Sequence, residues 1–328
     1  MENFNHFFAS ANSANGFLNN FKYINNEEKN GYLYILKGGP GTGKSTLLKT
    51  VAKHFENRGE KIEYFHCSSD PKSLDGIRIV SKNIALVDGT APHSLDPQFL
   101  KVKDEIIDLG NFVQNEVYND SKKIKNLLEI KTKSYALAYN FLHALKPIFS
   151  NKILLEKNSL IKNENDKIIK KLTLKKSEFP FIKRELFLTH FSSEGLKELN
   201  NSGYKILTLE TNFYEDNLTL KSLIKKLEEQ KISFTSCPNL IDQNYLDALI
   251  IPSSKVIIKA SSPYHSKDKD INFLINSLTK FAGKHIEDAI VYHKEVESFY
   301  IKVMDFKGIN KLTKNLIKKI ERQTFSSN

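Results

Sequence analysis

Short apolar runs alternate with a helical pattern in the first hundred residues. Residues 32–37, 61–67 and 84–87 are rich in aliphatic and aromatic side chains and have the length of buried strands. Between the first two runs, residues 47–55 repeat apolar positions at helical spacing. Because strands that alternate with helices are typical of parallel sheets, the pattern predicts an α/β core early in the chain.

Two later regions carry the helical pattern alone. From Val102, apolar residues recur at spacings of three and four as far as Val117, and a similar pattern continues to Pro147. Residues 286–320 show the same periodicity. We expect a long helical hairpin over about residues 100–150 and further helices near the C-terminus.

The two halves of the chain share a series of short segments in the same order, which indicates an internal duplication. The matched pairs are 7–10 with 186–189, Gly16 with Gly195, 31–32 with 203–204, 61–67 with 231–237, 74–75 with 246–247, and 84–88 with 256–259. The match of residues 61–67 predicts that Cys67 and Cys237 are equivalent residues at strand ends.

The strand at residues 32–37 runs directly into a phosphate-binding motif of the form G-x-x-x-x-G-K-S. The motif comprises Gly38, Gly39, Pro40, Gly41, Thr42, Gly43, Lys44, Ser45 and Thr46. Its glycines allow a tight turn whose N–H groups point at phosphate oxygens, and the following helix adds its positive end. We predict that Lys44 binds the β- and γ-phosphates and that Ser45 is a ligand of Mg²⁺.

The apolar strand at residues 84–87 ends in Asp88. An acid at this position holds Mg²⁺ in phosphoryl-transfer proteins, directly or through water, so Asp88 is predicted as the second metal ligand. The alternative is an ordinary aspartate in the turn at Gly89.

Two loops follow predicted strands and carry further candidates for catalysis. Asp70 could orient an attacking water or bind a second substrate, or it could simply form a turn before Pro71. His93 could contact phosphate or transfer a proton, or it could be a packed loop histidine. Arg78 is the only arginine near these loops.

The second copy has lost the phosphate motif. The position of Lys44 falls on Asp216, that of Gly43 on Glu215, and that of Asp88 on Lys259. Two acids would repel a triphosphate, so we expect a single nucleotide site in the N-terminal half.

The predicted fold class is α/β, with two P-loop NTPase-like parallel-sheet cores in tandem, each followed by a long helical hairpin. Residues 1–150 form the nucleotide-binding domain with its hairpin. Residues 151–181, rich in Lys and Asn, form a helical linker or extension, and residues 182–328 form the degenerate second domain with the C-terminal helices.

The amino-acid composition limits the kinds of binding partner that we expect. The formal net charge is +11, and residues 101–186 hold 18 basic and 11 acidic side chains, yet only four of the 49 basic residues are arginine. Arginine is the preferred bidentate hydrogen-bond donor to phosphates and bases, so the scarcity of arginine argues against nucleic-acid binding. No apolar run has the length of a membrane span, and two cysteines make no disulfide framework, so we expect a cytoplasmic protein.

The segments 35–46, 66–70, 73–76 and 87–93 together resemble a family of tandem P-loop ATPase-like proteins from Firmicutes. The resemblance is strong over residues 31–97 and faint over residues 182–328. Relatives usually carry a phosphate loop in both halves, and this chain departs from them in its second half. The resemblance implies binding of ATP or GTP, hydrolysis and a cytoplasmic location, and it names no substrate.

Three functions compete at this point. The first is an ATPase or GTPase that uses Mg²⁺, with Lys44, Ser45 and Asp88 in the roles above and Asp70 or His93 at the attacking water. The second is a kinase for a small molecule or nucleotide, because a single predicted strand between the loop strand and Asp88 is a spacing that kinases also show. The third is a nucleotide-dependent switch or scaffold with little turnover. A second substrate, a protein partner and a homo-oligomer all stay open.

Overall fold

The computed structural model describes residues 5–25, 31–114, 120–158, 165, 169, 172–175, 181–199, 203–264 and 268–323. The chain forms two compact units, each assembled from separate stretches of sequence. Unit 1 comprises Met1–Phe4, Ala11–Leu18 and Ala138–Gly283, and unit 2 comprises Asn5–Ser10, Asn19–Leu137 and Lys284–Asn328.

Unit 2 is built on a six-stranded sheet with the order β1-β5-β6-β7-β4-β8. The strands are β1 (His6–Phe8), β4 (Tyr32–Lys37), β5 (Ile62–His66), β6 (Leu74–Ile79), β7 (Ile84–Asp88) and β8 (Asp104–Asp108). Strand β4 is parallel to both β7 and β8, and β1 is parallel to β5, whereas β6 is antiparallel to both of its neighbours. The fold is therefore α/β as predicted, but the sheet is mixed rather than parallel.

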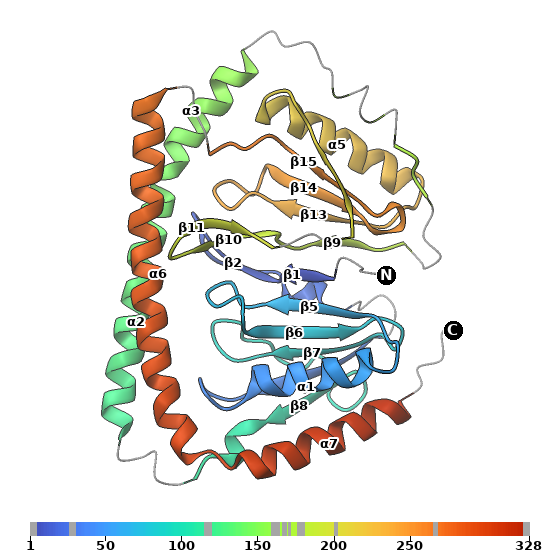
Figure 1. The fold of residues 1–328 in the computed structure, drawn as a ribbon, viewed down its shortest axis with the longest axis vertical. Coiled ribbons are helices and arrows are strands. Elements are labelled where there is room, and N and C mark those ends of the chain that lie inside the picture. Colours follow the sequence, from blue (N-terminus) through green and yellow to red (C-terminus); the bar gives the residue numbers. More distant parts are fainter. Residues whose placement is uncertain are drawn as a thin grey trace. The chain divides into compact units, whose positions relative to one another are not determined.

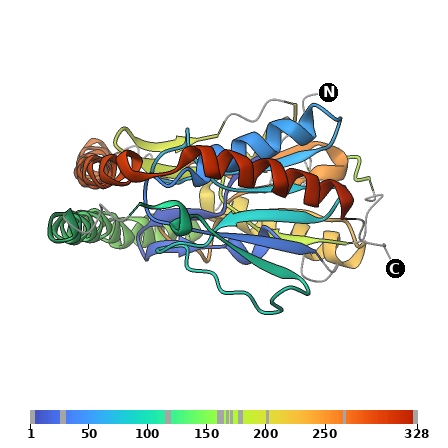
Figure 2. The same cartoon turned by 90° about the horizontal axis from the view of Figure 1, so that it is seen from below.

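Two helices far apart in the sequence cover this sheet in unit 2. Helix α1 (Lys44–Glu56) and helix α7 (Phe306–Arg322) lie side by side (Figures 1 and 2). Leu47, Val51 and Phe55 of α1 join Leu316 and Ile320 of α7 in one buried hydrophobic cluster with the strands. The C-terminal helix thus completes the core that begins at residue 32.

Unit 1 contains a five-stranded sheet with the order β12-β15-β14-β13-β9. Its strands are β9 (Lys183–Glu185), β12 (Lys205–Thr208), β13 (Phe234–Pro238), β14 (Leu246–Ile251) and β15 (Val256–Lys259). Helix α5 (Phe213–Glu229) packs on the sheet through Leu220, Leu223 and Leu227 (Figure 1). Helix α3 (Leu145–Lys157) contacts α5.

The two sheets have the same topology, which supports the predicted duplication. Strands β12, β15, β14, β13 and β9 repeat the order and directions of β4, β7, β6, β5 and β1. Each copy also has a hairpin, β2 (Ser10–Ser13) with β3 (Gly16–Asn19), and β10 (Thr189–Ser192) with β11 (Gly195–Glu198). Gly16 and Gly195 turn these hairpins with φ angles of 89° and 91°, a conformation that favours glycine.

The strand registers align the two copies residue by residue. Leu36 lies opposite Asp88 and Thr208 lies opposite Lys259, so the predicted equivalence of Asp88 and Lys259 agrees with the registers. The predicted equivalence of the cysteines is wrong. Because Phe65 pairs with Gly76 and Cys237 pairs with Ala248, Cys237 corresponds to Phe65, and Cys67 corresponds to Asn239.

The hairpin predicted over residues 100–150 is correct only in part. Residues 104–108 form β8, which pairs with β4, and a 3-10 turn follows at Leu109–Phe112. A strand followed by a turn therefore produces the spacing of three and four that we read as helical. Helix α2 (Ser121–His143) begins later, and Val117 lies outside the described residues.

The compact units also differ from the predicted consecutive domains. Helix α2 and helix α6 (Lys269–Val303) each contribute residues to both units, and the boundaries fall within these helices. Most of residues 151–181 lies outside the described residues, but Ile169, Leu172 and Leu174 pack against the hydrophobic core of unit 1. This stretch is therefore not simply a free linker.

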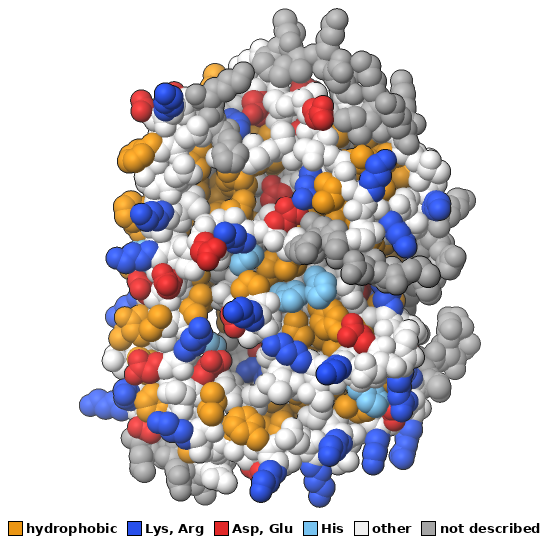
Figure 3. Space-filling view, in the orientation of Figure 1, with side chains coloured by type: hydrophobic (Ala, Val, Ile, Leu, Met, Phe, Trp, Pro, Cys, Tyr) orange, Lys and Arg blue, Asp and Glu red, His pale blue; other side chains and the backbone are white. Residues whose placement is uncertain are grey.

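One face of the molecule shows how its charged side chains are distributed. On the face shown in Figure 3, Lys and Arg side chains are spread out, with acidic side chains between them. Within the described residues, no helix combines the length and the apolar character that a membrane span requires.

Candidate functional site

The loop between β4 and α1, residues Gly38–Gly43, is here called the glycine loop. Gly41 and Gly43 have φ angles of 76° and 89°, a conformation that favours glycine. Gly43 is also the N-cap of α1, so the loop leads directly into the positive end of that helix. The Thr42 hydroxyl donates to the Gly39 carbonyl at 2.8 Å and fixes the turn from within.

Lys44 is folded back over the glycine loop. Its Nζ donates to the carbonyl oxygens of Gly38 at 2.6 Å and Gly39 at 2.9 Å, and it lies 3.5 Å from Oδ2 of Asp88. The two charged side chains are only 11% and 15% exposed. Lys44 and Asp88 are therefore brought together, as the sequence predicts.

The ends of β4 and β7 are tied to each other beside this ion pair. Asp88 Oδ1 accepts from the N–H of Thr90 at 2.8 Å, and the Thr90 hydroxyl donates to the Gly38 carbonyl at 2.9 Å. Ser45 Oγ accepts from the N–H of Leu74 at 3.0 Å, which joins α1 to the start of β6. Within the described part of the chain, no cluster of three or more His, Cys, Asp or Glu side chains could hold a metal by itself.

Asp70 closes a turn in the loop between β5 and β6. Its carboxylate accepts from the N–H of Lys72 at 3.2 Å and from the hydroxyl of Ser73 at 2.9 Å. Asp242 accepts from the N–H of Asn244 at 3.0 Å in the corresponding loop of the second copy. Since the turn is present in the copy that lacks the glycine loop, this geometry favours a structural role for Asp70.

His93 lies in the loop after β7 and is buried. Its ring stacks on Phe21 with 4.7 Å between centroids, and its Nε2 is 3.4 Å from Oδ2 of Asp75. Burial raises the pKa of Asp75 to about 6, because the carboxylate loses water and the charge on His93 offsets that loss only in part. His93 is thus held by Asp75, a residue that the sequence did not mark as a site residue.

Arg78 does not belong to this site. Its guanidinium lies 3.3 Å from the Glu63 carboxylate and 3.0 Å from Asn83 Oδ1. Arg78 sits near the end of β6 opposite to Ser45, because that strand begins at Leu74 and ends at Ile79.

Helices α2 and α6 supply site residues that the sequence did not reveal. A Cβ added at Gly41 would lie 2.7 Å from the Glu297 carbonyl oxygen, and one at Gly39 would lie 3.1 Å from the Tyr300 ring, so α6 contacts the glycine loop directly. The Tyr135 hydroxyl on α2 donates to Ser69 Oγ at 2.8 Å. These contacts join segments up to about 260 residues apart (300 − 39), and no local pattern marks such a pairing.

The second copy fills the corresponding helix N-terminus with its own acids. Asp216 is fully buried, and its carboxylate accepts from the N–H of Ser261 at 2.7 Å and from the Thr211 hydroxyl at 2.5 Å. Glu156 of α3 accepts from the N–H of Tyr214 in the first turn of α5 at 3.1 Å. Carboxylates therefore occupy the end of α5, where a phosphate would otherwise find N–H donors.

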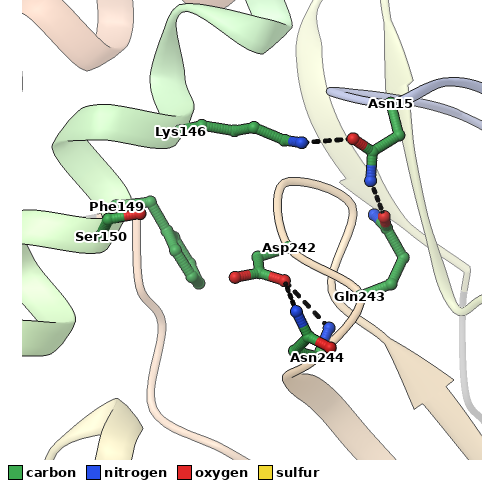
Figure 4. Close-up of a pocket in the computed structure, with 7 residues that line it drawn as sticks. All are labelled: Asn15, Lys146, Phe149, Ser150, Asp242, Gln243 and Asn244. Atoms are coloured by element: carbon green, nitrogen blue, oxygen red, sulfur yellow. Dashed lines mark hydrogen bonds between the residues drawn. The ribbon is translucent and has the colours of Figure 1, made fainter.

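Unit 1 also has a polar hollow of about 400 Å³ beside the turn that Asp242 forms (Figure 4). Lys146 donates to Asn15, and Asn15 donates to Gln243, so the polar side chains that the figure joins are satisfied by one another. Phe149 forms an apolar wall (Figure 4). This hollow has no glycine loop among its lining residues.

Comparison with known proteins gives one partial match. A family model described as Nephrocystin 3, N-terminal, matches residues 13–109. No curated protein and no solved structure gives a match. The matched range contains the glycine loop, Lys44 and Asp88, and it leaves the whole second half of the chain outside.

Proposed function

We propose that unit 2 binds ATP or GTP in the glycine loop and hydrolyses it in the presence of Mg²⁺. The observation that carries the proposal is the position of the Lys44 ammonium. It lies between the Gly38 and Gly39 carbonyls and the Asp88 carboxylate, at the N-terminus of a helix. Nucleotide phosphates are bound at such helix ends by N–H groups and a lysine.

The residues present fit a nucleotide with its metal. Lys44 and the loop N–H groups would hold the phosphates, and Ser45 and Asp88 would hold Mg²⁺. One hydroxyl and one carboxylate suffice, because Mg²⁺ in such sites keeps several waters and shares the phosphate oxygens. The bound magnesium nucleotide supplies the phosphoryl group, and the chain contributes positioning and charge. His93 remains the candidate for orienting water, because the turn geometry favours a structural role for Asp70.

A single nucleotide site per chain follows from the second copy. Asp216 and Glu156 place carboxylates at the N-terminus of α5, and Lys259 stands where Asp88 stands in the first copy. An anion would meet negative charge at that helix end, and residues 209–212 between β12 and α5 contain no lysine.

A nucleotide-dependent switch is the second candidate. The contact between Gly41 and the α6 backbone at Glu297 favours it, because a ligand that changes the glycine loop must also act on α6. By contrast, two strands, β5 and β6, separate β4 from β7 in the chain, so the single-strand spacing that suggested a kinase is absent.

Calorimetric titration with ATP and GTP in the presence of Mg²⁺, followed by phosphate release, tests the proposal. We expect one nucleotide per chain, and we expect Lys44→Ala to lower turnover at least about 100-fold, as removal of a charge-stabilising donor does. Lys53→Ala is the matched control, because Lys53 is exposed on the same helix.

Turnover that survives Lys44→Ala would overturn the hydrolysis proposal. Tight binding without turnover would favour the switch if nucleotide also alters hydrogen exchange in α6. Absence of nucleotide binding by the unaltered protein would contradict both candidates.

A further inference from the structure

One face of α2 lies against the nucleotide site proposed in unit 2. Ile124 and Leu127 pack with Val296 of α6 in a buried cluster. One turn beyond Lys131 on the same helix, the Tyr135 hydroxyl binds Ser69 in the loop after β5. Because residues four apart share a helix face, Lys131 lies between these two fixed contacts and faces the same side.

The facing part of α6 is anchored to the glycine loop. The Glu297 carbonyl contacts Gly41, and His293 lies one turn earlier on α6, with its Nε2 3.6 Å from the Glu297 carboxylate. Burial, together with the charges on Lys131 and Lys44, lowers the pKa of His293 to about 4. A neutral His293 at pH 7 thus lies close to both lysines.

Among the ion pairs found within the described residues, none involves Lys131. Burial lowers the pKa of Lys131, an interaction with Cys67 raises it, and the charge on Lys44 lowers it. Lys123 on the same helix is different, since it forms an ion pair with Glu295. A partly buried ammonium beside a second ammonium is unfavourable unless an anion joins them.

We propose that Lys131 contacts the terminal phosphate of the nucleotide and stabilises the charge on the phosphoryl group during transfer. This inference rests on the function proposed above. In related chemistry an arginine supplied from the same chain or from a partner has this role. Lys131 is a lysine in cis, placed by helix α2, which begins 13 residues after the end of β8 (121 − 108).

The arginines of the described chain are placed away from the terminal phosphate of the proposed nucleotide site. Arg78 binds Glu63, and Arg58 binds Glu321 beyond the C-terminal end of α1. Arg184 belongs to β9 of unit 1, and Arg322 is the last residue of α7. None of these four lies on the α2 or α6 face that borders the glycine loop.

The test compares binding of ADP with binding of a non-hydrolysable ATP analogue, both with Mg²⁺, and then measures kcat with ATP. Lys131→Met should lower affinity for the analogue at least about 10-fold and leave affinity for ADP within about 3-fold. It should lower kcat about 100-fold or more. Lys131→Arg should restore most of both losses. Lys133→Ala, an exposed position on the same helix, should behave as the unaltered protein.

An unchanged preference of Lys131→Met for the analogue over ADP would overturn the inference, even if kcat falls. If Lys131→Met does not fold, the Lys131→Arg variant tests the inference instead. If the role of Lys131 were purely structural, the arginine variant would show no effect that is selective for the terminal phosphate. Failure of the unaltered protein to bind either nucleotide would instead refute the proposed function. If the unaltered protein binds nucleotide without hydrolysing it, the comparison of its affinities for the analogue and for ADP still tests the inference.

Discussion

At the scale of single residues, one carboxylate is repeated in both copies. Asp75 on β6 accepts from Ser10 Oγ at 3.5 Å, and Asp247 on β14 accepts from Thr189 Oγ1 at 3.4 Å. Asp75 is buried and Asp247 is half-buried, and loss of water raises the pKa of Asp247 to about 7. Since unit 1 has no lysine in place of Lys44, the repeated carboxylate has a structural role that is independent of nucleotide.

Asp247→Asn should change how stability depends on pH. In the unfolded chain the carboxyl loses its proton near pH 4, whereas in the folded chain it does so near pH 7. The folded state therefore binds the proton more tightly, and stability falls as pH rises from about 4 to 7. The asparagine variant lacks this loss, so its thermal midpoint relative to the unaltered protein should rise between pH 5 and pH 8.

Glu229→Gln provides the control, because Glu229 is exposed on α5 in the same unit. It should leave the pH dependence of the midpoint unchanged. A parallel shift of the midpoint at every pH for Asp247→Asn would show that the carboxyl titrates alike in the folded and unfolded chains.

The sequence located those site residues that a local pattern encodes. Lys44 and Ser45 follow the glycines at fixed spacing, and Asp88 ends an apolar run, so each is visible within about ten residues. Asp75 and Lys131 have no such pattern around them. For Asp75, the repeated pair Leu-Asp at 74–75 and 246–247 was the available signal; for Lys131, none exists before α2 is placed.

At the scale of elements, the contact between α6 and the glycine loop makes Gly41→Ala a sharp test. The added methyl would lie 2.7 Å from the Glu297 carbonyl, at a φ of +76° that side chains rarely adopt. We expect a loss of stability beyond the roughly 1–2 kcal/mol of left-handed strain alone. Nucleotide affinity should fall as well, because the loop and α6 must separate. Chemical unfolding and titration calorimetry measure the two effects.

Gly59→Ala isolates the contribution of backbone strain. Gly59 has a φ of +83°, and nothing lies within 4 Å of an added Cβ there. If both variants lose the same stability, α6 does not press on the glycine loop in solution.

Elements were predicted well where periodicity and packing agree. Strand β4 and helix α1 appeared at their predicted positions because both are buried on the face that their pattern indicates. Strand β8 was mistaken for a helix. It is an edge strand of five residues, and its buried Asp104 accepts from the N–H groups of Gln98 and Phe99 at 2.7 Å each. A polar residue buried for this reason does not follow the hydrophobic pattern.

At the scale of the whole molecule, unit 2 joins the two ends of the chain. Leu316 and Ile320 of α7 belong to the same hydrophobic cluster as Leu47 and Phe55 of α1. Sequence periodicity predicts that α7 has an apolar face, but it does not say which core that face covers. For this reason consecutive domains were expected and interleaved units were found.

Removing residues 142–280, which make up most of unit 1, should leave unit 2 intact. The rings of Phe141 and Phe281 are 5.4 Å apart between centroids, so about eight Gly and Ser residues, which span roughly 15 Å, can replace residues 142–280. The shortened chain should unfold cooperatively by circular dichroism and bind nucleotide through Lys44.

A chain of residues 1–150 is the matched comparison. It keeps the glycine loop but lacks α7, so burial of Leu316 and Ile320, worth about 1.5–3 kcal/mol each, is lost. We expect it to unfold without a cooperative transition. Native-like unfolding of this chain would show that α7 is dispensable for the core.

The interleaving also sets an order of events during synthesis. The glycine loop leaves the ribosome early, but the helix that closes its core is made only after residues 138–283 have been translated. At about 5–20 residues per second this interval lasts roughly 7–30 s. During that time the sheet of unit 2 presents an uncovered apolar surface, and chaperones that bind nascent chains have their longest access to this protein there.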